Sequence, residues 1–251
     1  MSRATRTSRS SMSRANRVAL RGHYPELALF MLGALIAVVW VYATTTTVLF
    51  TSPSVAALTY VTHGKTAWEN GALGTESGLS TAEVAEGARQ ILNGDPAPAV
   101  EEALGADSAN HLVDVGRVVS VARGLALIAS ATLLLLGISA LASRGGRTTP
   151  LAPVLRGVST GTAVAAAVVA AVGLLAAVAF DAVFVTLHEV LFEPGTWTFP
   201  AGSLLIQTFP EQFWMASAAA WVAVAVSLGA VLRAAAVRCE GLLVNQEKSK
   251  G

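Results

Sequence analysis

The chain is poor in cysteine and in charge, and each scarcity excludes a class of protein. One cysteine, Cys239, among 251 residues excludes an intrachain disulfide. Charged residues make up only 13% of the chain and hydrophobic residues 53%, and the mean hydropathy is +0.59. Such a composition is too apolar for an ordinary soluble domain. Cys239 itself is expected to be inert.

Several motifs of catalytic and binding sites are also missing. The sequence has no serine nucleophile elbow, no glycine-rich phosphate loop, no cysteine pair, and no two histidines at the spacing of a zinc-binding helix. We therefore expect no metal and no cofactor. Residues 51–116 contain nine acidic residues against only Lys65 and Arg89, which argues against binding of nucleic acid.

Long apolar runs are the most prominent feature that is present. About 20 helical residues, rising 1.5 Å each, cross a hydrocarbon core of ~30 Å. Four runs qualify, at residues 27–50, 118–142, 158–187 and 213–237. Their length favours helices over barrel strands. The predicted fold class is an all-α membrane protein with four transmembrane helices and a helical extracytoplasmic cap.

The distribution of Arg and Lys predicts the orientation. Six arginines precede the first run, and residues 189–210 contain no Lys or Arg. Basic residues are retained on the cytoplasmic side, so both termini are expected there. The predicted organisation is a disordered cytoplasmic tail (1–22), transmembrane helices (23–50, 117–143, 158–188 and 211–238), the cap (51–116), a cytoplasmic loop (144–157), an extracytoplasmic aromatic loop (189–210) and a cytoplasmic tail (239–251).

Within the cap, residues 51–116, the local signals predict short helices. Ser80 followed three residues later by Glu83 is a capping box, and Asn93-Gly94 is a stop signal. A shorter helix is expected over 98–104. A segment of this size cannot build a large core of its own, so we expect it to rest on the outer ends of the transmembrane helices.

Two of the four histidines, His111 and His188, lie beside the outer ends of the second and third apolar runs. Brought together from different helices, they would form a buried acid–base site. Asp114, three residues after His111, could accept a hydrogen bond from one ring nitrogen, or it could belong to an acidic first turn. Asp181, seven residues before His188, is either a functional charge at membrane depth or an interfacial residue.

Further candidates flank His188. Glu189 could support that ring, although a solvated position fits it equally. Phe192, Trp197 and Phe213 either line a lipid-facing groove or form an interfacial aromatic belt. A metal site built from both histidines and one aspartate is a weaker alternative. His63 is expected at the surface.

At these residues the sequence resembles a known family. H-L-V-D-V at 111–115 and F-D-A-V-F-V-T-L-H-E-V-L-F at 180–192 are similar to the lipoprotein intramolecular transacylase (Lit) family of bacterial membrane proteins. The resemblance continues through Trp197 and Phe213 and covers most of the chain beyond residue 22. Gly116 departs from it, because the family often has lysine there.

The resemblance implies four transmembrane helices topped by an extracytoplasmic cap, in the bacterial cytoplasmic membrane. It implies transfer of the sn-2 acyl chain of an S-diacylglyceryl-cysteine lipoprotein to the α-amine of that cysteine, with His111 and His188 catalytic. The implied partners are a diacylated lipoprotein and membrane lipid, and the oligomeric state is left open. A histidine with a pKa of ~6.5 can act as base toward an amine of pKa ~7.7–8.0.

Two other functions remain open at this point. A non-enzymatic membrane scaffold could bind a partner through the acidic cap. A proton- or metal-linked transporter could use Asp181 and the histidines, although four helices without a discontinuous repeat favour it less.

Overall fold

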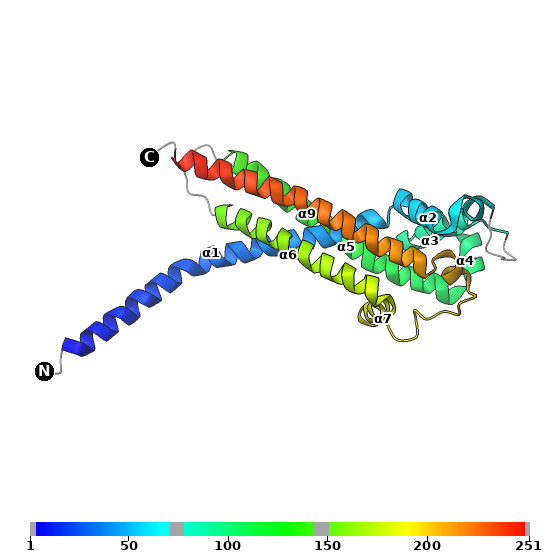
Figure 1. The fold of residues 1–251 in the computed structure, drawn as a ribbon, viewed down its shortest axis with the longest axis horizontal. Coiled ribbons are helices and arrows are strands. Elements are labelled where there is room, and N and C mark those ends of the chain that lie inside the picture. Colours follow the sequence, from blue (N-terminus) through cyan, green and yellow to red (C-terminus); the bar gives the residue numbers. More distant parts are fainter. Residues whose placement is uncertain (1–3, 71–77, 143–150, 249–251) are drawn as a thin grey trace. The chain divides into compact units, whose positions relative to one another are not determined.

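A computed structural model gives the structure and describes residues 4–70, 78–142 and 151–248, which contain helices and no strand (Figure 1). The helices are α1 (Ala4–Leu49), α2 (Ser52–Asn70), α3 (Thr81–Asn93), α4 (Pro98–Leu104), α5 (Ala106–Ala142), α6 (Leu151–Val178), α7 (Phe180–Leu191), α8 (Leu204–Thr208) and α9 (Glu211–Lys248).

Four of these helices are long and apolar enough to cross a membrane. The spans are Pro25–Leu49 in α1, Ala106–Ala142 in α5, Leu151–Val178 in α6 and Glu211–Asn245 in α9. Their outward side chains are largely apolar and exposed, as expected of surfaces that contact lipid rather than water. The predicted all-α membrane protein with four transmembrane helices is confirmed.

The chain divides into two compact units, and each long helix contributes to both. The first unit comprises Met1–Val39, Ala129–Ala165 and Gly229–Gly251. In it, α1 and α6 approach closely because glycines face the opposite backbone. A Cβ atom at Gly33 would lie 2.1 Å from the Val154 oxygen, and one at Gly157 would lie 2.0 Å from the Phe30 oxygen. Small residues of this kind permit tight helix contacts in a bilayer.

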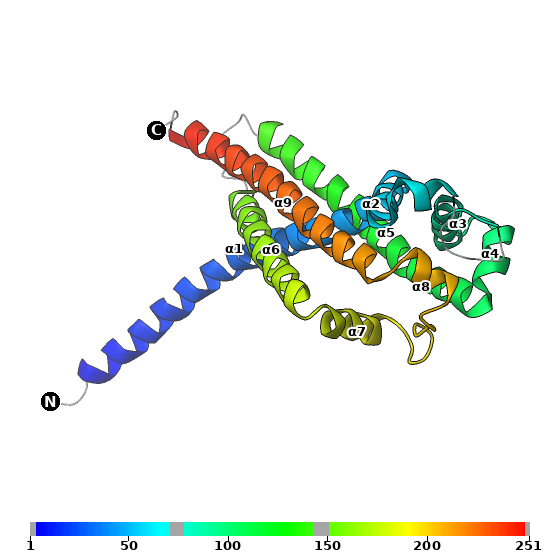
Figure 2. The ribbon, with the colours of Figure 1, turned by 45° about the vertical axis from the view of Figure 1, so that its right-hand side comes forward.

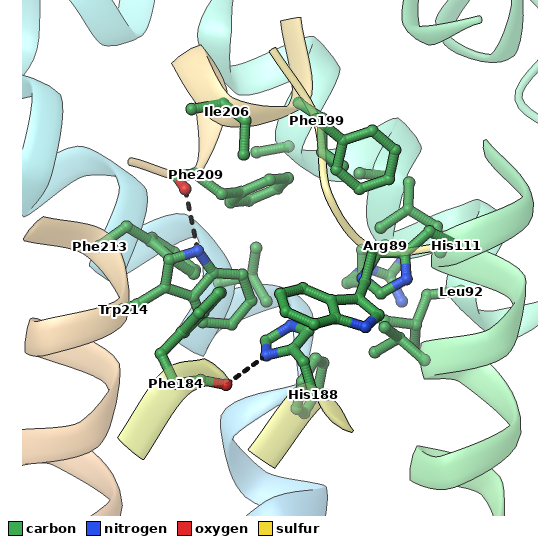
Figure 3. Close-up of a pocket in the computed structure, with 18 residues that line it drawn as sticks. Arg89, Leu92, His111, Phe184, His188, Phe199, Ile206, Phe209, Phe213 and Trp214 are labelled. Atoms are coloured by element: carbon green, nitrogen blue, oxygen red, sulfur yellow. Dashed lines mark hydrogen bonds between the residues drawn. The ribbon is translucent and has the colours of Figure 1, made fainter. Parts of the chain in front are cut away.

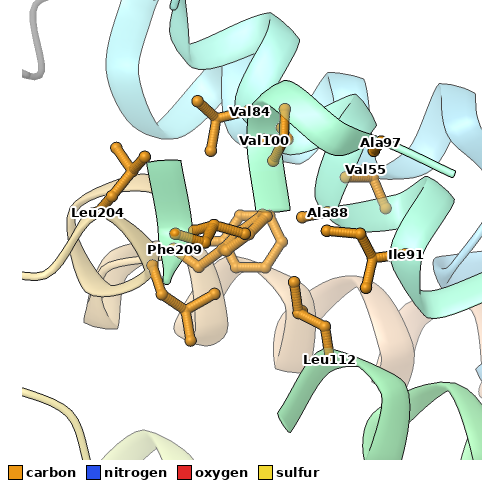
Figure 4. Close-up of a cluster of buried hydrophobic side chains, with 13 residues drawn as sticks. Val55, Val84, Ala88, Ile91, Ala97, Val100, Leu112, Leu204 and Phe209 are labelled. Carbon is orange, nitrogen blue, oxygen red and sulfur yellow. The ribbon is translucent and has the colours of Figure 1, made fainter. Parts of the chain in front are cut away.

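The second unit comprises Trp40–Ile128 and Ala166–Leu228 and contains the cap helices α2, α3 and α4. Helix α3 packs against α2, α4 and α8. Their apolar side chains form one cluster with residues of α5 and α9 (Figure 4). Its buried members are Val55, Val84, Ala85, Ala88, Ile91, Ala97, Val100, Leu104, Leu112, Leu204, Leu205, Phe209 and Phe213. The short cap helices thus share a core with the longer ones.

Local signals in the cap behave as predicted. The Ser80 hydroxyl accepts a hydrogen bond from the Glu83 backbone N–H, and the Glu83 carboxylate accepts one from the Ser80 N–H at 2.7 Å. Both halves of the capping box are therefore formed. Gly94 adopts a φ of 81°, the left-handed conformation that ends α3. Helix α4 spans Pro98–Leu104, as expected.

His63 differs from the expected surface position. It lies on α2, its side chain is half-buried, and its Nε2 is 2.9 Å from the Thr208 carbonyl oxygen. Because a carbonyl only accepts, Nε2 donates, and the bond ties α2 to the end of α8.

Helix α5 is packed against α3 at Gly116. A Cβ atom at this position would lie 2.0 Å from the Leu92 carbonyl oxygen, which is backbone and cannot swing aside. The close approach therefore requires glycine where the resembled family often has lysine. It also fixes α5 against the cap helix that carries Leu92.

Several helix ends differ from the predicted boundaries. Helix α5 begins at Ala106, after Gly105 with φ 79°, so His111 lies inside the helix rather than before it. Helix α1 begins at Ala4, within the tail (1–22) that the sequence predicts to be disordered. Residues 4–21 contain neither Gly nor Pro, and their Ala and Arg residues favour helix. Helix α9 continues to Lys248, into the predicted tail.

The third predicted span, 158–188, is divided in two. Helix α6 ends at Val178, and α7 starts at Phe180 after Ala179 with φ −138° and ψ 55°. Figures 1 and 2 both draw α7 as a separate helix beyond the end of α6. His188 consequently lies on a short helix outside the four spans.

Candidate active site

Helices α5 and α7 place two imidazole rings side by side. The ring centroids of His111 and His188 are 5.9 Å apart and the ring planes differ by 27°. Their exposed fractions are only 7% and 8%. Both residues belong to the second unit. Two neighbouring buried imidazoles can exchange protons with one bound group, which is the arrangement that acid–base chemistry needs.

His188 is oriented by its own helix. Its Nδ1 lies 2.8 Å from the carbonyl oxygen of Phe184, four residues earlier on α7 (Figure 3). Since a carbonyl oxygen can only accept, Nδ1 carries the proton, and in the neutral ring Nε2 keeps a free lone pair. Burial lowers the pKa of His188, and the bond to the Phe184 carbonyl partly opposes that shift. The neutral ring is thereby favoured.

His111 has a different environment. Its buried Nδ1 has no hydrogen-bond partner among the residues that the structure describes. Its ring contacts Phe192, with centroids 4.9 Å apart, and Phe199, with centroids 5.5 Å apart. Aromatic side chains therefore hold the ring in place while leaving a nitrogen without a partner. An unpaired buried nitrogen calls for a bound group or water.

Both rings face a pocket of about 100 Å³ within the second unit (Figure 3). Apart from the histidines and Arg89, its wall is formed by apolar and aromatic residues. The lining residues are Phe50, Val55, Ala85, Ala88, Arg89, Leu92, His111, Leu112, Val115, Phe184, His188, Trp197, Phe199, Leu205, Ile206, Phe209, Phe213 and Trp214. An apolar wall with a few polar groups is typical of a small-molecule or lipid site.

Arg89 is the one permanently charged side chain among the described residues that line the pocket. Its Nε donates to Glu86 at 2.9 Å, and Glu86 also accepts from the Ser52 hydroxyl at 3.0 Å. The hydrogen bonds from Arg89 lower the pKa of Glu86. The guanidinium is thus held against the pocket wall by a carboxylate of its own helix.

None of the three predicted supporting carboxylates forms a hydrogen bond or ion pair with His111 or His188. Asp114 pairs with Arg117, with 2.6 Å between Oδ1 and Nη1, so it does not hold the unpaired Nδ1 of His111. Asp181 is exposed in the first turn of α7, because the helix break at Ala179 removes it from the third span. Glu189 is also exposed.

The predicted aromatic residues gather at the pocket. Phe192 contacts both histidines, Trp197 has its ring centroid 5.1 Å from that of His188, and Phe213 is buried in the wall. Phe184 and Arg89 were missed. Helical spacing could have identified Phe184, because residue i−4 always faces residue i, and Arg89 stood out as one of two cations in an acidic segment.

Comparison with known proteins identifies the family. The family model described as lipoprotein intramolecular transacylase Lit matches residues 31–214. No curated protein matches the chain.

A solved structure supports the same fold. An in meso structure of the membrane integral lipoprotein intramolecular transacylase Lit from Bacillus cereus is 19% identical, with a TM-score of 0.63, over 91% of this chain and 98% of that one. A histidine-to-arginine mutant of the B. cereus protein is 18% identical over 94% of this chain and 97% of its own, with a TM-score of 0.46. The first likeness shows a shared fold. Because the family model covers more than half of its residues, the chain belongs to the lipoprotein intramolecular transacylase (Lit) family of membrane acyltransferase enzymes.

Proposed function

We propose that this protein moves the sn-2 acyl chain of an S-diacylglyceryl-cysteine lipoprotein to the α-amine of the same cysteine. The product is an N-acyl, S-monoacylglyceryl (lyso-form) lipoprotein. The observation that carries the proposal is the pair of buried imidazoles, His111 and His188, on one apolar pocket. Family membership supplies the lipoprotein substrate and the intramolecular transfer.

His188 acts as the general base. Its Nδ1 is committed to the Phe184 carbonyl, so Nε2 is the nitrogen free to take a proton. As the neutral amine attacks the ester carbonyl carbon, the new N–C bond forms and Nε2 removes a proton from nitrogen. A positioned base of this kind typically contributes ~10²–10⁴-fold in rate.

His111 acts at the leaving group. Collapse of the tetrahedral species breaks the bond between the carbonyl carbon and the sn-2 glyceryl oxygen, which needs one proton to leave as a hydroxyl. His111 is close enough to His188 to serve that oxygen while the other ring serves the amine. The proton that His188 took from the amine replaces the one that His111 gives to this oxygen, so both rings end neutral. The ester is consumed and the amide and hydroxyl are formed with no net change in protons.

The nucleophile and the ester belong to one molecule, so alignment replaces a covalent enzyme intermediate. Effective molarities of well-oriented intramolecular reactions reach ~10⁵–10⁸ M. Phe213 and Trp197 provide apolar surface in the pocket wall on which the acyl chain and glyceryl group are held, and Phe192 supports both histidines. The step requires no metal or cofactor.

The proposed location follows from the charges. The protein is integral to the membrane, and we assign it to the bacterial cytoplasmic membrane with both termini cytoplasmic. The cap and the histidine pair then face outward, where acylated lipoproteins are presented.

The test uses purified full-length protein in lipid bicelles and a synthetic S-diacylglyceryl-cysteine peptide with a deuterated sn-2 chain. Tandem mass spectrometry is expected to find the label on the amine nitrogen. A peptide labelled at sn-1 should keep its label on the glyceryl group, and an N-acetylated peptide should not react. Release of free fatty acid, or transfer of the sn-1 label, would contradict the proposal.

A further inference from the structure

The proposed acyl transfer has a charge requirement that the two histidines do not meet. When the amine attacks, the carbonyl oxygen gains negative charge and needs a hydrogen-bond donor. Removing one such donor from an acyl-transfer site typically costs ~10²–10³-fold in rate. The donors other than imidazole in the described pocket wall belong to Arg89, Trp197 and Trp214.

Two of these three side chains already have hydrogen-bond partners. The Trp214 indole N–H donates to the Phe209 carbonyl at 2.9 Å (Figure 3). Arg89 donates to Glu86 from both Nε and Nη2. The Trp214 N–H would have to give up its bond to serve the substrate. Arg89 keeps further N–H groups, but its guanidinium is held to the Glu86 carboxylate by two bonds.

Trp197 is different. Its indole nitrogen is buried and forms no hydrogen bond within the described parts of the chain. A buried N–H without a partner is costly, and native sites retain one where it has a role. The ring centroid of Trp197 is 5.1 Å from that of His188, so the indole ring lies beside the base and both line the same pocket.

The loop that carries Trp197 is built to present it. Gly195 adopts a φ of 88°, a conformation that favours glycine, and the Thr196 N–H donates to the Glu193 carbonyl at 3.2 Å. The Thr196 hydroxyl donates to the same carbonyl at 2.9 Å. These bonds form a turn that fixes the backbone immediately before Trp197.

We infer that the indole N–H of Trp197 donates a hydrogen bond to the ester carbonyl oxygen and stabilises the oxyanion that forms there. This inference rests on the proposed function. The indole gives up no proton: as the N–C bond forms, the carbonyl π electrons move onto oxygen, and they return when the glyceryl C–O bond breaks. The role differs from those of the histidines, which move protons at nitrogen and at the leaving oxygen.

The experiment replaces Trp197 with benzothienylalanine, which keeps the shape of the ring but carries sulfur in place of N–H. Trp197→Phe is the second variant. We expect both to slow single-turnover conversion of the diacylated peptide by ~10²–10³-fold with little change in apparent KM. Trp221 of α9, which packs against Tyr42 away from the pocket, receives the same two replacements as the control and should retain the wild-type rate.

The outcomes are separable. A wild-type rate with benzothienylalanine at position 197 overturns the inference. If Trp197→Phe is slow in the same experiment, only the shape of the ring matters. Failure of wild-type protein and the Trp221 controls to convert the peptide would instead contradict the proposed function, and this inference with it.

Discussion

The single hydrogen bond between His188 and the Phe184 carbonyl determines which nitrogen of that ring is available for chemistry. The acceptor is supplied by the helix itself, one turn earlier, so no carboxylate is needed to select the tautomer. His111 lacks such a bond among the described residues and is held by Phe192 and Phe199 instead. The two imidazoles are therefore chemically distinct.

The pH dependence of the rate reports on His188. Protonation of the substrate amine alone should make the logarithm of the rate fall by about one per pH unit below about pH 7.7. Burial lowers the pKa of His188, so this base stays neutral as the pH falls. Its protonation should steepen the slope of log rate against pH from about one to about two only below about pH 6.5. Single-turnover rates across this range measure it. A slope of about two already at neutral pH would contradict the lowered pKa.

The carboxylates near the site should be dispensable for chemistry. Asp181 and Glu189 are exposed, and Asp114 is paired with Arg117. We expect Asp181→Asn, Glu189→Gln and Asp114→Asn each to retain conversion within about threefold of the wild-type rate, far from the ~10²–10⁴-fold loss of a missing acid or base. A loss of the larger size in Asp114→Asn would indicate that this carboxylate does serve His111 during the reaction.

At the scale of helices, the site depends on where each element begins and ends. Helix α5 carries His111 and is fixed against α3 through Gly116. Helix α7 carries His188 and exists separately because the chain breaks at Ala179. The capping box of Ser80 and Glu83 sets the start of α3. A shift of any of these ends by a few residues would move one ring away from the other.

The contact at Gly116 can be tested with alanine. In Gly116→Ala the new Cβ meets the Leu92 carbonyl oxygen, so α3 must move, and overpacking of this kind costs about 1–3 kcal/mol. We expect a lower Tm in detergent and slower conversion. Gly124→Ala on the same helix is the control, since nothing lies within 4 Å of its Cβ. Its Tm should stay the same or rise, because alanine favours helix by about 1 kcal/mol over glycine. Equal Tm values for the two variants would contradict the packing argument.

Sequence reasoning reached the parts of the fold that have local causes. Length and polarity predicted the four spans, and the capping box and the stop at Gly94 predicted both ends of α3. The break at Ala179 has no such signal, because neither Gly nor Pro lies there. The partner of Asp114 was likewise ambiguous, since Arg117 and His111 are both three residues away, in opposite directions.

At the scale of the whole molecule, the charge pattern and the site constrain one another. Acylated lipoproteins are modified outside the cytoplasm in the proposed reaction, so residues 51–116 and 189–210 should face outward. The arginines before the first span, and Lys248 and Lys250 after the fourth, should face inward. A single orientation has to satisfy both requirements.

Cysteine accessibility measures that orientation. In a Cys239→Ser background, Glu193→Cys in the loop after α7 and Asn245→Cys near the end of α9 both place a thiol at an exposed position. A membrane-impermeant maleimide should label Glu193→Cys in intact cells and Asn245→Cys only after permeabilisation. The reverse pattern would contradict the outward-facing site.

The most direct measurement of the central claim is the single-turnover rate of the diacylated peptide with His111→Ala and His188→Ala, both checked for folding by Tm. If the two neighbouring imidazoles carry the acid–base chemistry, each variant loses ~10²–10⁴-fold in rate while Asp181→Asn converts the peptide normally. A wild-type rate in either folded histidine variant would contradict the account.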